Sequence, residues 1–225
     1  MPARPAALAV CLLAAASAVA EPAPCSDPML SVDAPDATTA DRVCIAAIQA
    51  KAQLAACGLA QNNPVSIEIV PHIDGPADTC AGLYHCDADR ISLIPPDTVA
   101  DVMPAESVFA TLDAEEYYDS LIVHELAHAL MEQAECSAPR CDADKEYVAY
   151  AMQFLSLPDS AQAALLSWRD QPGEVPKGQL NDFLLWMKPD VFAFKAWSHF
   201  ASLEDGCAFV SELVDGTATL ALPEM

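Results

Sequence analysis

The amino-acid sequence predicts an α+β fold, in which a small and mostly antiparallel sheet packs on a long helix and precedes a mainly helical C-terminal half. Two observations predict this order. Short stretches of alternating apolar and polar residues lie between residues 65 and 95, as is typical of strands. Longer segments with apolar residues three and four apart lie on either side, and they dominate from about residue 143. We therefore expect a single domain over residues 38–225.

The first 20 residues have the features of a secretory signal peptide. Arg4 gives a basic start, residues 6–16 form an apolar run, and Ala18 and Ala20 form a small-x-small cleavage site. The run is too short to cross a bilayer, which takes about 20 residues. We therefore expect export to the periplasm or the extracellular medium, with no membrane contact once the peptide is removed.

The elements after the signal peptide follow from local patterns. Residues 21–37 are rich in proline and are expected to form an extended leader. Asp113 and Glu116 have the spacing of a capping box for the long helix. Strands are expected at residues 65–69, 81–86 and 90–95, with a turn at 87–89. Helices are expected at about 40–57, with Thr38 or Thr39 as N-cap, and at 114–134, 143–157, 159–168, 180–187 and 190–203.

The charge balance excludes some classes of partner. The chain has 10 Lys and Arg against 33 Asp and Glu, so its formal net charge is −23. A chain with this charge repels nucleic-acid phosphate and anionic membranes. A neutral or basic peptide would approach more readily, and the sequence does not predict an oligomeric state.

The cysteines point to an oxidising compartment. Signal cleavage would remove Cys11 and leave eight of the nine cysteines, enough for up to four disulfides. Eight cysteines allow 105 pairings, and we expect only the two pairs that are close in sequence, Cys80–Cys86 and Cys136–Cys141. A thiolate zinc site is disfavoured because no C-x-x-C repeat is present.

Residues 122–130, Ile-Val-His-Glu-Leu-Ala-His-Ala-Leu, contain a His-Glu-x-x-His motif. On a helix, His124 and His128 lie on one face and can each present a ring nitrogen to one zinc ion. Glu125 is one step around the helix, where it can hydrogen-bond a water held by the metal. The uncharged flanks predict a buried helix, and zinc would compensate the cost of burying these polar groups.

A catalytic zinc site needs a third protein ligand, and we expect Glu146 to supply it. Glu146 opens an otherwise apolar helical segment, and a helical hairpin would return it to the two histidines. Asp142 and Asp144 are rival ligands. No histidine follows His128 until His199, so a third histidine ligand close in sequence is absent.

The motif at residues 123–129, followed by Glu146 on a helix, resembles the gluzincin branch of zinc metallopeptidases. The match is clear over about residues 117–152 and weaker over the strands before it. The resemblance implies a zincin-like domain, zinc held by His124, His128 and Glu146, Glu125 as general base, and an edge strand that pairs with an extended substrate. Thermolysin-like members have an Asp four residues after the ligand Glu, but Tyr150 stands there in this chain, so another group must orient a zinc histidine.

The predicted activity is hydrolysis of peptide bonds in a peptide or protein substrate, with Zn²⁺ as cofactor. An oxyanion donor is still required, and His199 is the candidate that we place in the catalytic set. Tyrosines 117, 118, 147 and 150 are alternatives, while His72 and His85 are expected to be surface or structural residues. The alternative functions are an inactive metallopeptidase-like binding module and a structural zinc protein.

Overall fold

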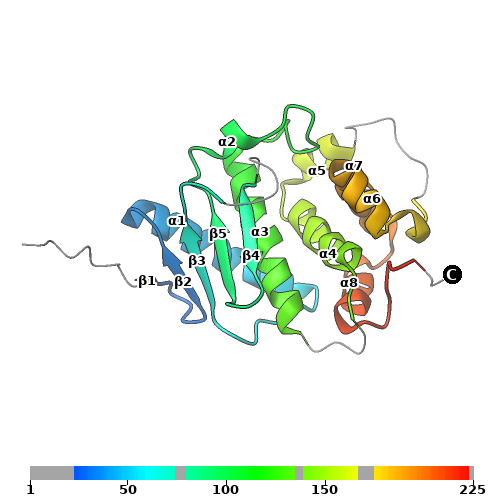
Figure 1. Ribbon diagram of the computed structural model, residues 1–225, viewed down its shortest axis with the longest axis horizontal. Helices are drawn as coiled ribbons and strands as arrows, with labels where there is room; N and C mark the ends of the chain where they lie inside the picture. The colour runs from blue at the N-terminus through cyan, green and yellow to red at the C-terminus, as the bar shows by residue number, and fades with distance from the viewer. Residues whose placement is uncertain (1–22, 74–79, 135–138, 167–174, 223–225) are drawn as a thin grey trace, which may run out of the picture.

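The computed structural model describes residues 23–73, 80–134, 139–166 and 175–222 (Figure 1). The predicted signal peptide lies outside these residues. The fold is mixed α and β, with a small five-stranded sheet followed by a mostly helical C-terminal half, and this confirms the predicted fold class. Among the described helices, none combines the length and the apolar character that a membrane crossing requires.

The sheet has the strand order β1-β2-β3-β5-β4. Its strands are β1 (Ala23–Pro24), β2 (Leu30–Asp33), β3 (Val65–Ile69), β4 (Gly82–His85) and β5 (Arg90–Leu93). The three predicted strands are present, and β4 and β5 form the expected antiparallel hairpin. The sheet is mixed rather than mostly antiparallel, because β3 pairs in parallel with both β2 and β5. Strands β1 and β2 lie in the segment that was expected to form an extended leader.

The described helices are α1 (Ala37–Ala56), α2 (Val99–Val102), α3 (Ala114–Gln133), α4 (Asp142–Leu155), α5 (Asp159–Leu166), α6 (Asp182–Met187), α7 (Pro189–Ser202) and α8 (Gly206–Asp215), with a 3-10 turn at Lys177–Gln179. Helix α1 begins earlier than expected because Asp36, not a threonine, caps it by accepting a hydrogen bond from the Thr39 N–H. Helix α8 was not expected from the sequence. It is capped by Asp205, and Gly216 ends it in the left-handed conformation.

Helix α3 lies between the two halves of the molecule (Figure 1). It packs against α1 and β4 on the side of the sheet and against α4 on the side of the C-terminal helices. Because it has neighbours on several sides, every residue from Ser120 to Ala127 is buried. The fold therefore places the His-Glu-x-x-His motif in the interior, next to the first helix of the C-terminal half.

Two disulfides join parts of the chain that are distant in sequence. Cys25–Cys44 ties the segment before β2 to α1, and Cys57–Cys207 ties the end of α1 to the start of α8. Each bridge fixes an element of the N-terminal half to its neighbour.

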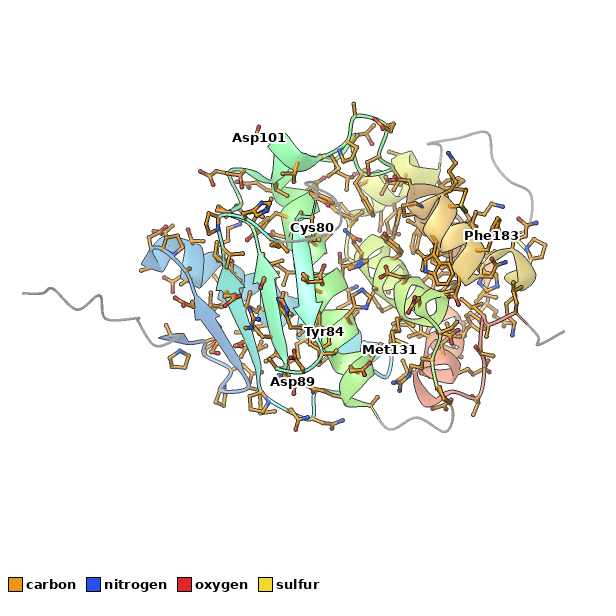
Figure 2. All side chains as sticks on the ribbon, in the orientation of Figure 1. Cys80, Tyr84, Asp89, Asp101, Met131 and Phe183 are labelled. Atoms are coloured by element: carbon orange, nitrogen blue, oxygen red, sulfur yellow. A yellow bond between two sulfur atoms is a disulfide. The ribbon has the colours of Figure 1, made fainter. Side chains whose placement is uncertain are left out.

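The expected pair Cys80–Cys86 is wrong, because both thiols are free. Strand β4 lies between these two cysteines, with Cys80 at the end away from Tyr84 (Figure 2). Six extended residues span about 20 Å, whereas a disulfide needs Cα atoms within about 7 Å. Cys136 lies outside the described residues, and its expected partner Cys141 has a free thiol.

Candidate metal centre

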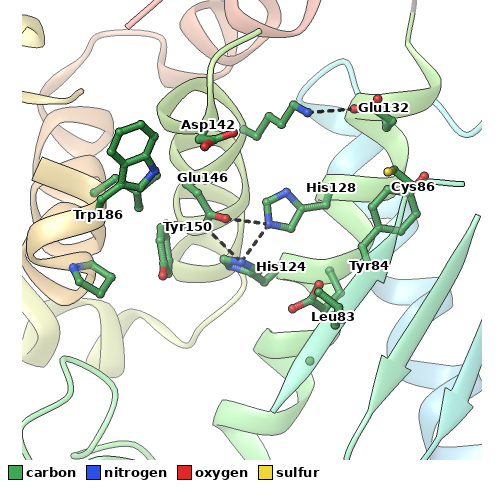
Figure 3. Close-up of a pocket in the computed structure, with 15 residues that line it drawn as sticks. Leu83, Tyr84, Cys86, His124, His128, Glu132, Asp142, Glu146, Tyr150 and Trp186 are labelled. Atoms are coloured by element: carbon green, nitrogen blue, oxygen red, sulfur yellow. Dashed lines mark hydrogen bonds and ion pairs between the residues drawn. The ribbon is translucent and has the colours of Figure 1, made fainter. Parts of the chain in front are cut away.

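Two helices bring three possible metal ligands together. His124 and His128 lie one turn apart on α3, and Glu146 extends toward them from the first half of α4 (Figure 3). The Nε2 atoms of the two histidines are 3.2 Å apart. The Glu146 carboxylate oxygens lie 3.6 Å from His124 Nε2 and 3.5 Å from His128 Nε2. These are the only described residues that form such a group of three or more potential ligands.

The spacing of these atoms fits a tetrahedral ion. Atoms bound at 2.0–2.1 Å to a tetrahedral zinc ion are about 3.3–3.4 Å apart. The two Nε2 atoms are 3.2 Å apart, and each lies 3.5–3.6 Å from one of the two Glu146 carboxylate oxygens. Two imidazoles and one carboxylate are also a donor set that zinc accepts. The residues present therefore fit a zinc ion.

A chain of hydrogen bonds fixes the tautomer of His124. The Ser120 hydroxyl donates to the Tyr117 carbonyl, at 2.7 Å, and so accepts from Gln153 Nε2, at 3.2 Å. The Gln153 amide oxygen then faces His124 Nδ1 at 3.0 Å, and it can only accept. Nδ1 must therefore carry the proton, which leaves the Nε2 lone pair directed at Glu146 and His128. Gln153 orients the His124 ring, in the way that a carboxylate orients a metal-bound histidine at many metal sites.

Glu125 lies beside this group and is held by the backbone of β4. It lines the same cavity as His124, His128 and Glu146, and a hydrogen bond from the Tyr84 backbone favours its charged form. The neighbouring Gly82 leaves room for the side chain, since a Cβ at this position would meet Glu125 Oε1 at 2.7 Å. The edge strand therefore has to carry a glycine where the glutamate packs against it.

Burial sets the protonation of these groups in the metal-free protein. It raises the pKa of Glu125 to about 8 and that of Glu146 to about 7, each with a further contribution from a neighbouring carboxylate. It lowers the pKa of His128 to about 4 and that of His124 well below its usual value. Both histidines are consequently neutral at pH 7, and neutral imidazole is the form that binds a metal.

The group lies in an open cavity of about 590 Å³. Strand β4 forms one wall, since β4 is the edge strand of the sheet and pairs only with β5. Helix α6 contributes Trp186 across from it (Figure 3). The three potential ligand groups therefore have open space beside them.

Among the tyrosines suggested as oxyanion donors, Tyr150 is the one that lines this cavity. Its ring packs edge-on against His124, with centroids 4.7 Å apart (Figure 3). Its hydroxyl has no hydrogen-bond partner among the described residues. The Tyr118 hydroxyl, by contrast, donates to the Ile94 carbonyl at 3.0 Å.

His199 lies outside the cavity that contains His124, His128 and Glu146. Its Nδ1 is 2.8 Å from the Tyr147 hydroxyl, and both rings pack against Phe209 between α4, α7 and α8. Neither His199 nor Tyr147 lines the cavity. We therefore do not keep His199 in the candidate site.

The two aspartates named as rival ligands and the two remaining histidines lie outside the group of three potential ligands. Asp142 lines the cavity but is not part of the ligand group, and Asp144 instead accepts hydrogen bonds from Thr219 and Leu220 near the C-terminus. His85 bonds to Ser92 within the sheet, and His72 is exposed. Sequence reasoning missed Gln153, although a polar residue two turns after Glu146 in an apolar helix was a usable signal.

Comparisons with known proteins give one match. No curated protein and no solved structure matches the chain. One family model matches residues 30–223, which include the whole candidate metal centre. The chain therefore belongs to DUF6639, a family of unknown function.

Proposed function

We propose that this protein is an exported zinc-dependent peptidase. The observation that carries the proposal is the convergence of His124, His128 and Glu146 around one point, with the carboxyl group of Glu125 beside them in an open cavity. A closed structural zinc site would need a fourth protein ligand. Among the described residues, the group has three ligands, which favours a catalytic site over a structural one.

In this proposal, α3 supplies two zinc ligands and the general base, and α4 supplies the third ligand. Zinc held by His124, His128 and Glu146 would polarise the carbonyl group of a peptide bond and acidify an attacking water. Glu125 would accept the proton of that water and pass it to the leaving amine. The backbone bond from Tyr84 holds the Glu125 carboxylate in position for this transfer. The Tyr150 hydroxyl is the nearest candidate to hydrogen-bond the developing oxyanion.

The edge of β4 offers a site for the substrate backbone. Its outer side faces the cavity, and an extended peptide can bind to such an edge as an additional strand. The signal-peptide features and the two disulfides support export to an oxidising compartment. A peptide or protein in the periplasm or the medium is therefore the proposed substrate.

Zinc analysis combined with a peptidase assay tests this proposal. We expect the purified protein to hold about one zinc ion per chain and to cleave fluorogenic peptides. The Glu125→Gln variant should keep its zinc and lose about 10²–10⁴-fold in kcat, as expected when a general base is removed. Glu204→Gln changes an exposed glutamate two residues after the end of α7 and serves as the matched control. Equal rates for Glu125→Gln and wild type would exclude the proposed base.

A further inference from the structure

A second cavity of about 240 Å³ adjoins the metal centre. It shares His124, Tyr150 and Pro189 with the main cavity, so it opens at the point where a scissile bond would lie. A side chain next to that bond could enter it. Which side chain this second cavity accepts is a question that rests on the proposed peptidase function.

One part of the wall of the second cavity is apolar. Phe109, Tyr117, Leu121 and Tyr150 contribute rings and one aliphatic side chain. The rings of Phe109 and Tyr117 have centroids 5.5 Å apart, and those of Phe109 and Tyr150 are 6.4 Å apart. Such a surface suits the aliphatic stem of a long side chain.

One carboxylate lies in this cavity. Asp190 is in the first turn of α7, and its Oδ1 accepts hydrogen bonds from the Ser107 hydroxyl at 2.8 Å and the Val108 N–H at 3.0 Å. These bonds fix the carboxylate, and its Oδ2 has no partner among the described residues. No ion pair of the described part of the chain involves Asp190.

The remaining polar groups also favour a hydrogen-bond donor as ligand. The amide of Gln153 is already used by His124 and Ser120. The hydroxyls of Tyr117 and Tyr150 have no hydrogen-bond partner among the described residues. Asp190 lines the same cavity as both tyrosine rings. A cationic head group would find one charged and two neutral acceptors there.

We propose that this second cavity binds an arginine or lysine side chain next to the scissile bond, with Asp190 as the residue that determines this specificity. The stem would lie against the aromatic walls, and the head group would pair with Asp190 Oδ2. The partly buried carboxylate makes this pair stronger than one at the surface. The net charge of −23 would also attract basic peptides.

Two peptides that differ in one non-hydrogen atom test the specificity. One contains a single arginine, and the other contains citrulline, which has the same shape without the charge. We expect wild-type kcat/KM to be at least about tenfold higher for the arginine peptide, and mass spectrometry should locate the cut next to that arginine. The Asp190→Asn variant should lose this preference by slowing cleavage of the arginine peptide alone. Asp159→Asn, in the first turn of α5, is the matched control and should keep the preference.

The outcomes separate this proposal from the peptidase function. Cleavage of both peptides at equal rates, or a preference retained in Asp190→Asn, would overturn the role of the second cavity and leave the peptidase function standing. If Asp190→Asn does not fold, the wild-type ratio of kcat/KM for the arginine and citrulline peptides tests the proposal alone. If zinc is bound but neither peptide is cleaved, the proposed peptidase function is wrong. Fluorescence anisotropy with zinc-loaded Glu125→Gln then tests the second cavity alone. Equal affinities for the two peptides would overturn the proposal that this cavity binds a basic side chain.

Discussion

Two faces of helix α4 carry buried contacts to a histidine, and they differ in what surrounds the ring. On one face, Glu146 meets His124 and His128, whose Nε2 atoms converge next to an open cavity. On another face, Tyr147 pairs with His199 among aromatic rings. The Tyr147 hydroxyl bonds Nδ1 of His199, whereas the first group brings two imidazole nitrogens and a carboxyl group together around one point. Convergence of several potential ligands, rather than burial of a histidine, therefore distinguishes the candidate metal centre.

The strongest test of this comparison is zinc content. Replacing His128 with alanine removes one of three ligands, so we expect the variant to lose stoichiometric zinc and all peptidase activity. Replacing His199 with alanine should leave about one zinc ion per chain, because its ring touches none of the ligands. Elemental analysis of both purified variants measures the difference. A zinc-free His199→Ala protein that remains folded would break the comparison.

A smaller effect is expected for the residue that orients His124. Replacing Gln153 with alanine removes the acceptor for the Nδ1 proton, and such losses typically weaken metal binding by 10–100-fold. Competition with a chromophoric chelator measures this affinity. Gln162→Ala is a matched control, because that side chain bonds to backbone carbonyls after α4 and contacts no ligand. An unchanged zinc affinity in Gln153→Ala would show that the tautomer is fixed by something else.

A change in the edge strand β4 should affect kcat rather than zinc content. Replacing Gly82 with alanine would place a Cβ at 2.7 Å from Glu125 Oε1, so the carboxylate must move. We expect kcat to fall by about tenfold or more, since small misplacements of a catalytic group are costly, while zinc content stays the same. Gly178→Ala is the control, because a Cβ there meets nothing within 4 Å. Equal rates for the two variants would argue against a fixed position for Glu125.

Local patterns in the sequence predicted the parts of the site that lie within single elements. The His-Glu-x-x-His spacing placed two potential ligands on α3, and a lone glutamate in an apolar segment indicated Glu146 as the third. The parts that depend on three-dimensional packing were not predictable. Cys57 and Cys207, which form a disulfide, are 150 residues apart. Asp190 is held at the second cavity by hydrogen bonds from Ser107 and Val108, which precede it by 83 and 82 residues. The parallel pairing of β2 with β3 likewise depends on α1 returning the chain to the same end of the sheet.

The smallest expected effect is the pH dependence of metal stabilisation. Burial raises the pKa of Glu146 to about 7 and that of Glu125 to about 8 in the metal-free fold, above their usual value of 4.5. Between pH 4.5 and these values, the carboxyls are protonated in the metal-free fold but ionised in the unfolded chain, so the metal-free protein loses stability as the pH rises from about 4.5 to about 8. A cation favours the ionised forms and offsets this loss.

The histidines act in the opposite direction and at lower pH. The pKa of His128 is lowered to about 4 in the fold. The contribution of His128 to the stability of the fold is therefore lost as the pH falls from 6.5, its pKa in the unfolded chain, toward 4. We therefore expect the Tm difference between zinc-loaded and chelator-treated protein to be greater at pH 8 than at pH 5.5. Differential scanning fluorimetry measures this difference, and in Glu146→Gln it should shrink at both pH values. A Tm difference that does not change with pH in the wild type would mean that zinc binding releases no protons from these buried groups.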